Sequence, residues 1–563
     1  MHFRVGLECE RTWDLSVGWC ANCNVPVAGS QPCGLCSQAT EKMRVAAGEI
    51  KPVFGAETEF YRLVISRALG DKYSEFLDRG LAFCTRSGEL VIDGKKIFNI
   101  RYDSHGGQWT AQLTRSFERN PVDPRGTELG QFLQANAYHV RQKEHEAVCF
   151  LRETRDANVS WPLAVSFSGG KDSTVALALT RKICRKPQAV FMNTAIEFDE
   201  TVLYSRAICE AWDVRLHELA PPTDFMYLIR KLGPPSRIMR WCCKTQKFGP
   251  LNRFVADQYS SGVLMVAGIR RAESNSRSRL SRIQTNHMVP KEKLVFPILD
   301  WTSLDVWLYI LYRRIPYNPL YDRGYRRVGC WACPEKSSFD SGLVASTHPD
   351  LGHRLNTVLR EFALSRGLDD VEGWIADGTW KQWKTQWQQS VGCAARDCID
   401  QGGVTYRFEN PELAGRATEL MKVFGDVRRC ALGSIIDGSE IHIAVTGNGM
   451  RATFEDGRSR RIFEKQLRKA LNCVGCGACV GSCPRGAISV IQGFVSISEK
   501  CIHCLKCATS NGIRMNCVAL NYKPDILSLV HRGLAPKPSH RSQVDDAQVE
   551  ERDTGPLQQT TCQ

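Results

Sequence analysis

The chain has 563 residues, of which 43% are hydrophobic and 24% are charged, and its formal net charge is +14. A chain of this length should hold several domains, because single hydrophobic cores stop growing near about 250–300 residues. The sequence contains no apolar stretch of about 18 residues that could span a bilayer. Its N-terminal segment carries acidic residues where a signal peptide needs an apolar core, so we expect a cytoplasmic protein without membrane contact.

The 25 cysteines need an explanation other than disulfide bonds, which a reducing cytosol does not maintain. Most of them form Cys-x-x-Cys pairs, a spacing that is typical of metal ligands. Four thiolates around zinc or a [4Fe–4S] core leave a site with a charge of about −2, so such sites would offset much of the positive charge. The net charge is therefore weak evidence for nucleic-acid binding, which we do not expect but leave open.

The first cysteines form two knuckles, Cys20-Ala-Asn-Cys23 and Cys33-Gly-Leu-Cys36, nine residues apart. Small and turn-forming residues lie between the cysteines, which suits a zinc ribbon over residues 1–50 with four thiolates around one ion. An iron–sulfur cluster and a group of buried thiols are the alternatives.

Residues 51–145 carry no chemistry that can be named and are expected to form a small α/β module. Residues 90–103 have the pattern of a hairpin that turns at Asp93-Gly94. The module weakly resembles RNA-binding PUA domains, and a structural spacer is the alternative.

From residue 161 onward, apolar strands alternate with amphipathic helices. Strands at 162–167, 188–194, 214–219 and 263–269, with helices at 172–186 and 199–212, predict an α/β domain with a doubly wound parallel sheet over residues 146–345. Ligands bind such sheets at the carboxyl ends of the strands, and the sequence SFSGGKDST at 166–174 lies at one of these ends.

This glycine-rich segment is typical of a loop that binds phosphate groups of an adenine nucleotide. Its glycines let backbone N–H groups point inward, the following helix adds its positive end, and the lysine adds a charge. The spacing differs from the Walker pattern, which has four residues between its glycines. The residues expected to bind the nucleotide are Ser168, Gly169, Gly170, Lys171, Asp172, Ser173 and Thr174. The loop alone does not separate ATP from a sulfonucleotide.

Two further cysteine pairs follow, Cys242-Cys243 and Cys330-Trp-Ala-Cys333. Adjacent thiols cannot both enter one apolar pocket. They can, however, both ligate one cluster, with a Cys-x-x-Cys pair supplying the other two ligands. We therefore predict a [4Fe–4S] site from these four cysteines, with zinc or reduced thiols as alternatives.

Together these motifs resemble the cluster-binding branch of the phosphoadenosine phosphosulfate (PAPS) reductase family. The resemblance covers roughly residues 160–335 and includes MNTAIEFDET at 192–201 and GIRRAES at 268–274. It implies a sheet of the adenine nucleotide α-hydrolase-like type, a sulfonucleotide whose phosphosulfate end lies on the loop, and sulfite as product. It also implies that Arg270 and Arg271 hold phosphate or sulfate, unless they are solvated surface, and that Lys244 bridges cluster and sulfate electrostatically.

The sequence departs from the family pattern at several points. Within residues 193–199, Asn, Ala and Asp stand where the family has Asp, Gly and Pro, and the loop keeps the full form that ATP-splitting relatives keep. The C-terminal motif Glu-Cys-Gly-Leu-His, which supplies the family's nucleophilic cysteine, is absent. Cys562 is a candidate replacement, Cys393 or Cys398 is another, and a reaction without a thiol nucleophile is the third.

Residues 346–465 are expected to form a helical region that reaches to about residue 430, followed by a small α/β segment. Trp374, Trp380, Trp383 and Trp387 recur at near-helical spacing and are interpreted as core residues. Residues 526–563 are polar and are expected to be disordered.

Residues 466–525 have the pattern of a bacterial ferredoxin with two [4Fe–4S] clusters, joined by a hairpin at 487–498. In such domains the fourth cysteine of each run ligates the other cluster. One site should therefore contain Cys473, Cys476, Cys479 and Cys517, and the other Cys501, Cys504, Cys507 and Cys483. The second run is stretched before its last cysteine and lacks the proline, which leaves a damaged cluster as the alternative.

The ferredoxin pattern favours a reductase, because an enzyme that only makes adenylates has no use for low-potential clusters. We therefore expect an iron–sulfur oxidoreductase that reduces PAPS or adenylyl sulfate to sulfite with electrons from its ferredoxin domain and an external donor. An ATP-dependent sulfurtransferase acting on tRNA or another acceptor is the alternative, and a non-catalytic electron-transfer subunit is a third class. The oligomeric state stays open, a homo-oligomer included.

Overall fold

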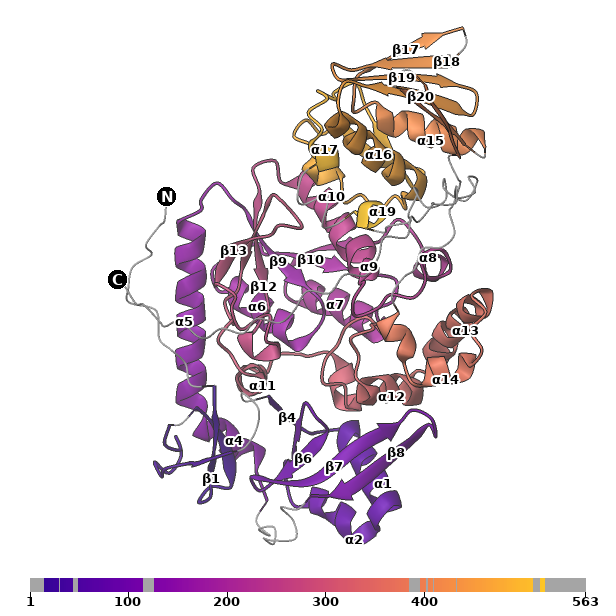
Figure 1. The fold of residues 1–563 in the computed structure, drawn as a ribbon. Coiled ribbons are helices and arrows are strands. Elements are labelled where there is room, and N and C mark those ends of the chain that lie inside the picture. The colour runs from indigo at the N-terminus through magenta and orange to yellow at the C-terminus, as the bar shows by residue number, and fades with distance from the viewer. Residues whose placement is uncertain are drawn as a thin grey trace, which may run out of the picture.

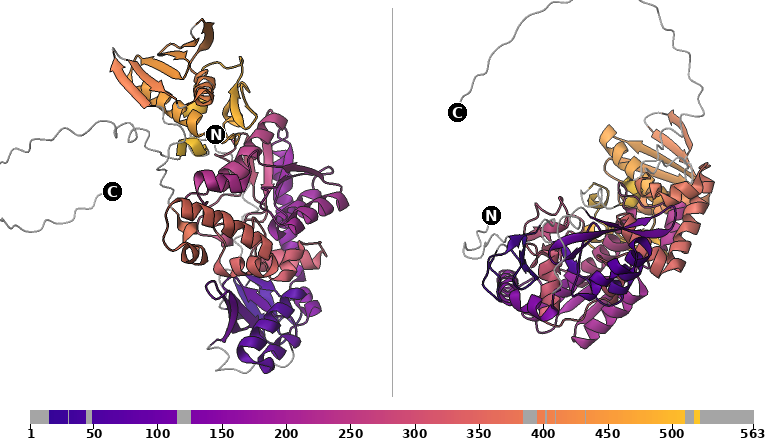
Figure 2. Two further views of the ribbon diagram at one scale, coloured as in Figure 1. Left: turned by 90° about the vertical axis from the view of Figure 1, so that its right-hand side faces the viewer. Right: turned by 90° about the horizontal axis from the view of Figure 1, so that it is seen from below.

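The computed structural model describes residues 15–29, 31–43, 49–114, 126–383, 395–400, 403–408, 410–431, 433–509 and 517–521. The described elements form five sheets. Figure 1 shows the N-terminal sheets at one end of the molecule, a parallel sheet in the middle and the C-terminal elements at the other end, and Figure 2 shows the same order in a view turned by 90°. The predicted disordered tail and Cys562 lie outside the described residues.

Two antiparallel sheets form the N-terminal end. The first consists of β1 (Val17–Cys20), β2 (Val25–Ala28) and β3 (Glu41–Lys42), and the second of β4 (Ile50–Pro52), β5 (Phe83–Thr85), β6 (Glu89–Ile92), β7 (Lys95–Asp103) and β8 (Gln108–Leu113), with α1 (Ala56–Leu69) and α2 (Asp71–Ser74). The predicted hairpin is confirmed, since β6 and β7 pair across Asp93 and Gly94, whose φ angles are 48° and 73°. Positive φ at both positions gives the turn a twist that matches the strands.

The central sheet has the strand order β11-β10-β9-β12-β14-β13. Its strands are β9 (Leu163–Phe167), β10 (Gln188–Met192), β11 (Arg215–Leu219), β12 (Val263–Ala267), β13 (Ile283–Thr285) and β14 (Glu292–Val295). All neighbours pair in parallel except β13 and β14, so the predicted parallel sheet is confirmed with one antiparallel strand at its edge.

Helices lie on both faces of this sheet. They are α5 (Ala137–Asp156), α6 (Lys171–Arg181), α7 (Asp199–Ala211), α10 (Gly249–Gln258) and α11 (Ser303–Tyr312). Two further helices pack elsewhere, α4 (Leu129–Ala135) against β2 and α8 (Phe225–Leu232) against α13 (Pro349–Ser365). Val165 and Phe167 of β9 share a core with α6, whereas Ala164 shares a separate core with Val255 of α10. Because successive side chains of a strand point to opposite faces of the sheet, β9 contributes apolar residues to the helical layer on each face.

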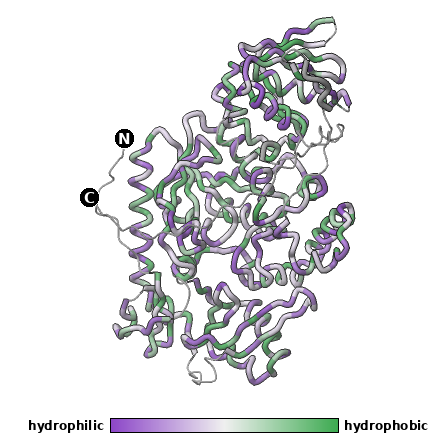
Figure 3. The backbone as a smooth tube through the Cα atoms, viewed as in Figure 1, coloured by the Kyte–Doolittle hydropathy of each residue, from purple (hydrophilic) through white to green (hydrophobic). Residues whose placement is uncertain are grey.

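Helix α5 runs along one side of the sheet, and hydrophilic and hydrophobic residues alternate along it (Figure 3). From its buried side, His139 Nε2 lies 2.7 Å and Lys143 Nζ 3.5 Å from the carboxylate of Asp305 on α11. Although burial opposes it, the charge of Lys143 and the contact with His139 hold the pKa of Asp305 below its ordinary range. These contacts attach α5 to α11 and give the buried Asp305 carboxylate a cationic partner in Lys143.

The helices α12 (Ser338–Thr347), α13 (Pro349–Ser365) and α14 (Val371–Ala376) follow the central domain. Trp374 and Trp380 are buried in a small core with Phe362, and Trp383 packs against it. The interpretation of these tryptophans as core residues is confirmed, while Trp387 lies outside the described residues.

The prediction of helical structure up to about residue 430 is wrong at residues 395–400, 403–407 and 426–430, which form strands. The described residues there form the antiparallel sheet β15-β16-β20-β19-β18-β17, covered by α15 (Pro411–Met421) and α16 (Gly457–Asn472). The strands are β15 (Ala395–Asp400), β16 (Gly403–Arg407), β17 (Asp426–Cys430), β18 (Gly433–Asp437), β19 (Ile441–Thr446) and β20 (Gly449–Phe454). Because β16 pairs with the distant β20, local sequence patterns carried little signal for it.

The C-terminal cysteines lie around the hairpin of β21 (Ile488–Ile491) and β22 (Phe494–Ile497), with the short helices α17 (Lys506–Thr509) and α19 (Val518–Asn521). The hairpin predicted at 487–498 is thereby confirmed. In the part of the chain that the structure describes, no helix is both long and apolar enough to cross a lipid bilayer.

Candidate functional site

The predicted phosphate loop joins β9 to α6 at the carboxyl end of the parallel strands. Gly169 has a φ of 67°, and a Cβ at this position would lie 2.7 Å from Ser205 Oγ. A Cβ at Gly268, just beyond β12, would lie 2.3 Å from the carbonyl oxygen of Asp172. Both glycines are therefore required for the close approach of the loop to its neighbours. In this arrangement the N-terminal end of α6 points toward the carboxyl edge of the sheet, where a helix N-terminus favours an anion.

The hydroxyl groups of the loop are used largely within the protein. Thr174 Oγ1 donates to the Gly170 carbonyl oxygen at 3.1 Å and lies 2.9 Å from the Tyr204 hydroxyl. Ser173 Oγ donates to the same carbonyl at 2.9 Å and lies 3.1 Å from Ser168 Oγ. Thr174 is completely buried, so the prediction that it donates to a phosphate is not supported by this geometry.

Lys171 and Arg270 converge on one carboxylate. Lys171 Nζ lies 2.6 Å from Asp172 Oδ2, and Arg270 Nε lies 2.6 Å from Asp172 Oδ1. Arg270 also pairs with Glu49, which comes from the N-terminal end of the chain. Burial lowers the pKa of Lys171, and the charge of Asp172 opposes that shift. The resemblance implies that Arg270 holds phosphate or sulfate, and in the structure two carboxylates contact its guanidinium.

Arg271 does not face the loop. Its Nε lies 2.6 Å from Asp300 Oδ1, and its Nη1 donates to the carbonyl oxygens of Ser278 and Leu280. The side chain thus ties the segment after β12 to the segment before α11. The predicted role of Arg271 in holding phosphate or sulfate is replaced by this structural one.

A pocket opens beside the loop. Lys171, Arg270, Glu273 and the neighbouring arginines 326 and 327 line it from the central domain, and residues 49–51 and 84–86 line it from the N-terminal sheet. Sequence reasoning missed the contribution of the N-terminal sheet, because nothing in the local pattern of residues 51–145 indicates which surface they cover.

The predicted cluster site takes its four cysteines, 242, 243, 330 and 333, from two segments of the central domain. The first two lie in the short helix α9 (Trp241–Cys243), and the other two lie in the loop before α12. A hydrogen bond from the Cys242 thiol lowers the pKa of Cys243 to about 6. Burial and the charge of Glu197 raise the pKa of Cys330 to about 12. A hydrogen bond to Cys243 and burial raise the pKa of Cys242, and the charges of Cys330 and Cys333 add to this shift, which agrees with the two pairs lying near each other.

This cysteine group lies at the same sheet edge as the phosphate loop. Cys330 Sγ lies 3.6 Å from Thr194 Oγ1 and 3.2 Å from Glu197 Oε1, in the segment that follows β10. Tyr321, in the segment that leads to Cys330, accepts a hydrogen bond from the backbone N–H of Lys171 at 2.9 Å. The segment that contacts the phosphate loop through Tyr321 therefore continues along the chain to Cys330.

Four thiols are a donor set that a [4Fe–4S] cluster accepts. Among the described residues, the N-terminal cysteines alone form a group of three or more ligand atoms within 4.8 Å of one another.

Two lysines near α9 have different surroundings. Lys247 lies 3.8 Å from Glu197 Oε1, and the charges of Cys330 and Glu197 raise its pKa, although burial opposes the shift. Burial lowers the pKa of Lys244, and the charges of Cys517 in the C-terminal module and of Cys243 oppose that shift. Sequence reasoning selected Lys244, which is adjacent to the pair, and missed Lys247. The π-helical segment Lys244–Phe248 places the residue four positions after Cys243 beside the thiols.

The crossed ligation pattern predicts that the C-terminal cysteines form two sets. Cys473, Cys476, Cys479 and Cys517 line one cavity. Cys483 adds to the charges that raise the pKa values of Cys501 and Cys507, and Cys504 acts in the same way on Cys501, although burial is the larger cause for both thiols. The backbone N–H groups of Gly475 and Ala487 donate to Cys473 Sγ and Cys483 Sγ. Sulfurs that accept such hydrogen bonds suit [4Fe–4S] clusters.

A buried lysine lies between the two sets. Lys469 is 2% exposed, and its Nζ lies 3.3 Å from the Cys507 carbonyl oxygen. Burial opposes its charge, but the neighbouring thiols of both sets raise its pKa. A cation at this point would balance the anionic charge that two thiolate-bound clusters carry.

The cysteine set that contains Cys473, Cys476, Cys479 and Cys517 lies directly against the central domain. Asn252 of α10 donates to the Ala478 carbonyl oxygen at 2.9 Å, and Thr223 Oγ1 donates to the Val474 carbonyl oxygen at 3.0 Å. A Cβ added to Gly249 would lie 2.1 Å from the carbonyl oxygen of Cys476. Cys476 and Cys242 also pack against one common core.

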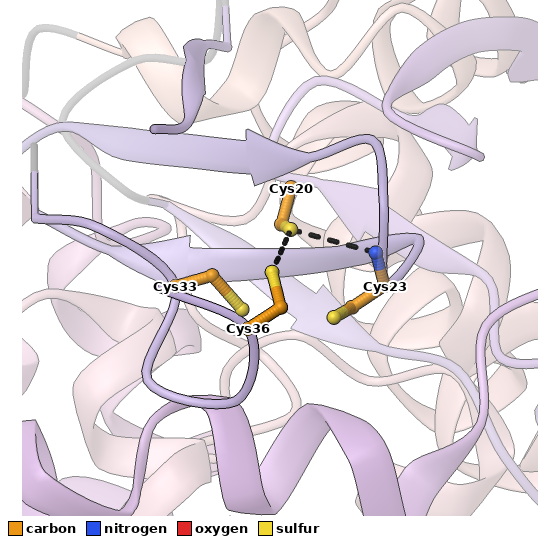
Figure 4. A group of neighbouring side chains, drawn as sticks. All are labelled: Cys20, Cys23, Cys33 and Cys36. Atoms are coloured by element: carbon orange, nitrogen blue, oxygen red, sulfur yellow. Dashed lines mark hydrogen bonds between the residues drawn. The ribbon is translucent and has the colours of Figure 1, made fainter. Parts of the chain in front are cut away.

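The N-terminal cysteines form the tightest group. The ligand atoms of Cys20, Cys23, Cys33 and Cys36 lie within 4.8 Å of one another. Figure 4 shows that the four side chains, from the β1–β2 turn and the following loop, point toward one another. Hydrogen bonds lower the pKa of Cys36 to about 6, which favours the thiolate form that a metal requires.

The expected nucleophilic thiol is not identified. Cys562 and Cys393 lie outside the described residues, and so does the side chain of Cys398. Cys84 lines the pocket beside the loop, but burial and the charge of Glu57 raise its pKa. A buried thiol with a raised pKa is a poor nucleophile.

Comparisons with known proteins match two parts of the chain. A sequence profile of the phosphoadenosine phosphosulfate reductase domain matches residues 162–336, and a profile of the 4Fe-4S binding domain matches residues 470–489. The first match includes the phosphate loop and the four cysteines from 242 to 333.

Individual relatives match the same region. An uncharacterized protein of Methanocaldococcus jannaschii is 35% identical over 253 residues, which are 45% of this chain and 52% of the relative, so the chain spans about half the length of that relative. A phosphoadenosine 5′-phosphosulfate reductase of Gloeobacter violaceus is 30% identical over 30% of this chain and 69% of its own length. An adenosine 5′-phosphosulfate reductase of Staphylococcus epidermidis is 30% identical over 30% of this chain and 70% of its own length.

Proposed function

Because the chain belongs to the phosphoadenosine phosphosulfate reductase family, we propose that it is an iron–sulfur oxidoreductase acting on a sulfonucleotide. The substrate is PAPS or adenylyl sulfate, and the products are sulfite and the corresponding adenosine phosphate. The C-terminal ferredoxin-type module supplies the electrons. Relatives named for either nucleotide match this chain about equally well, so the comparisons leave the choice between them open.

The observation that carries this proposal is the shared position of loop and cysteines. Cys330 contacts Thr194 after β10, Lys171 begins α6 after β9, and β9 and β10 are adjacent strands. A nucleotide phosphate on the loop would therefore lie beside a cluster held by the four cysteines. An enzyme that only activates substrates with ATP does not need this arrangement.

The proposed reaction is balanced in atoms and electrons. Two electrons cleave the sulfur–oxygen bond of the phosphosulfate, sulfur(VI) becomes sulfur(IV) as sulfite, and the bridging oxygen stays with the phosphate. When bound, each [4Fe–4S] cluster supplies one electron at a time. The chain's own contribution is to hold the phosphosulfate at Lys171 and the end of α6, and to place the positive charge of Lys247 beside Cys330.

The C-terminal module requires an external reductant. We propose a ferredoxin-like or other one-electron donor that reaches the distal cysteine set, in which Cys504 is exposed. We propose that the protein acts in a reducing compartment such as the cytoplasm, because its cysteines are spaced as metal ligands.

The most direct test is an anaerobic assay with reduced viologen. Wild-type protein should release sulfite from at least one of the two sulfonucleotides, and Cys330→Ser should lower the rate to background. Cys184→Ser, which changes a cysteine outside the three groups, is the matched control. Absence of sulfite from both nucleotides in protein with its full iron content would reject the function.

The N-terminal cysteines are proposed to form a zinc ribbon, because their close spacing fits one tetrahedral ion. Cys36→Ser should remove about one equivalent of zinc and release β1 and β2 from protection against hydrogen exchange, since structural zinc contributes roughly 10–16 kcal/mol to folding of such sites. Elemental analysis and hydrogen exchange measure the two effects. Unchanged zinc content in this variant, or iron in its place, would contradict the assignment.

The complete glycine loop and the zinc site also fit an ATP-dependent sulfurtransferase acting on tRNA. This alternative predicts conversion of ATP to AMP that RNA stimulates. The same anaerobic preparation distinguishes the two functions, because a sulfurtransferase would turn over ATP and leave both sulfonucleotides intact.

A further inference from the structure

Helix α16 joins the antiparallel sheet β15–β20 to the C-terminal cysteines. Ile462 and Phe463 of this helix share one hydrophobic core with residues of β19 and β20. The same core contains Ile488 of the ferredoxin-type hairpin and Cys507. The helix is therefore held from both sides, and its buried side chains have defined positions among the cysteines.

Helix α15 attaches the same sheet domain to the module at two further points. Glu419 accepts hydrogen bonds from the Ile497 backbone N–H at 2.7 Å and from Ser496 Oγ at 3.1 Å. His503 Nδ1 lies 3.1 Å from the carbonyl oxygen of Lys422 at the end of α15. The sheet domain and the module are thus connected by polar contacts as well as by the common core.

Lys469 of α16 contacts both predicted cysteine sets. It lines the cavity of one set, and its Nζ lies 3.3 Å from the carbonyl oxygen of Cys507, which belongs to the other. We call the first the proximal set and the second the distal set. The proximal set consists of Cys473, Cys476, Cys479 and Cys517, and the distal set of Cys483, Cys501, Cys504 and Cys507.

The surroundings of Lys469 contain anionic groups of one kind. Among the described residues from 457 onward, Lys469 is the one charged residue that is buried, and no carboxylate forms an ion pair with it. Burial opposes its charge, but thiols of both sets raise its pKa. A buried ammonium group needs a compensating negative charge, and here the cysteine sites are positioned to supply it.

Gln466 lies almost one helical turn before Lys469 and is 1% exposed. Its Nε2 lies 4.0 Å from Cys507 Sγ in the distal set. It does not line the cavity of the proximal set, so we expect it to influence the distal set alone. Gln466 and Lys469 therefore differ in the number of sites that they contact.

We propose that Lys469 acts as a positioning residue that fixes one positive charge between the two clusters of the module and raises both reduction potentials. A cluster held by four thiolates has a charge of about −2 when oxidised and gains one negative charge on reduction, so a nearby cation favours the reduced form. Because one charge acts on both sites, one donor can reduce both. The inference rests on the proposed two-cluster module, and it gives the sheet domain a role through α16.

A redox titration of anaerobically purified full-length protein, followed by electron paramagnetic resonance without substrate, tests this proposal. Of three one-electron steps in wild type, two should shift in Lys469→Met. Reduction should become about 10-fold less favourable in each, which is about 59 mV for a one-electron couple. Lys469→Arg keeps the charge and should restore most of the shift. Gln466→Met should shift one step alone, by about threefold, because it removes a hydrogen bond to one sulfur.

Arg461→Met, which removes an exposed cation of the same helix outside the cavity, is the matched control and should leave all steps unchanged. Unshifted potentials in Lys469→Met, or a shift of one step only, would overturn the proposal. If Lys469→Met loses iron, its retention in Lys469→Arg would still show that the charge is required. Loss from both variants would show that the side chain only fills space, which also overturns the proposal.

The titration separates this inference from the proposed function. A wild-type protein with two steps would lack the cluster at cysteines 242–333, which would count against the reductase function and leave the test of Lys469 intact. A wild-type protein without the two steps of the module would overturn the inference and the proposed electron source together.

Discussion

Lys247→Met is expected to lower the rate of sulfite formation by about 100- to 1,000-fold, the usual effect of removing one preorganised electrostatic group from an active site. The lysine lies beside Cys330 and 3.8 Å from Glu197 Oε1, and the surrounding negative charges raise its pKa, so it stays protonated at neutral pH. Its charge would stabilise the added negative charge when two electrons reach the substrate. Methionine keeps the length and apolar stem of the side chain without that charge.

Measuring kcat and KM separately distinguishes an electrostatic role of Lys247 from a structural one. We expect kcat to fall while KM changes by less than about threefold, because the charge acts where negative charge develops. Lys247→Arg should restore part of the rate. The matched control is Lys244→Met, which changes a lysine on the same segment that lies near Cys517. Equal losses in the two methionine variants would contradict the specific role of Lys247.

Gly249→Ala is expected to slow ferredoxin-driven sulfite formation by about 10- to 100-fold, corresponding to roughly 1–3 kcal/mol of overpacking at the contact. The added Cβ would lie 2.1 Å from the Cys476 carbonyl oxygen, so the C-terminal module must move away from α10. In a helix, alanine is otherwise favoured over glycine by about 1 kcal/mol. Any loss therefore has to come from the contact and not from the helix.

Gly352→Ala in α13 is the control, since a Cβ there meets no atom within 4 Å. Both variants should retain their iron. Hydrogen exchange of residues 474–481 should increase in Gly249→Ala alone, because Asn252 and Thr223 lose their carbonyl partners in this segment. Wild-type rates and wild-type exchange in Gly249→Ala would show that the two modules do not depend on this contact.

Local patterns predicted the elements that carry chemistry. The strands around 163–167 and 188–192, the hairpin at Asp93-Gly94 and the hairpin between the ferredoxin runs all lie where alternation and turn residues indicated them. The cysteine spacings likewise predicted which thiols share a site, Cys517 with the first run included. In each case a few neighbouring residues define both the geometry and the chemistry.

Residue roles that depend on distant partners could not be predicted in this way. Arg270 and Arg271 look alike in the sequence, yet Arg270 meets Glu49 and Asp172 while Arg271 meets Asp300. Lys244 and Lys247 are equally plausible neighbours of the cysteine pair until the π-helical segment places one beside Cys330 and the other near Cys517.

The amino-acid sequence alone predicted a phosphate-binding loop, three groups of paired cysteines and the sheet that carries the loop. It could do so because glycine turns, cysteine spacing and strand periodicity are each defined by a few neighbouring residues. The tertiary structure decided which of these features are in contact. Cys330 contacts Thr194, the ferredoxin segment around Cys476 packs against Gly249, and the N-terminal sheet lines the pocket that contains Lys171. Such meetings depend on packing between segments hundreds of residues apart, and no short stretch of sequence contains that information.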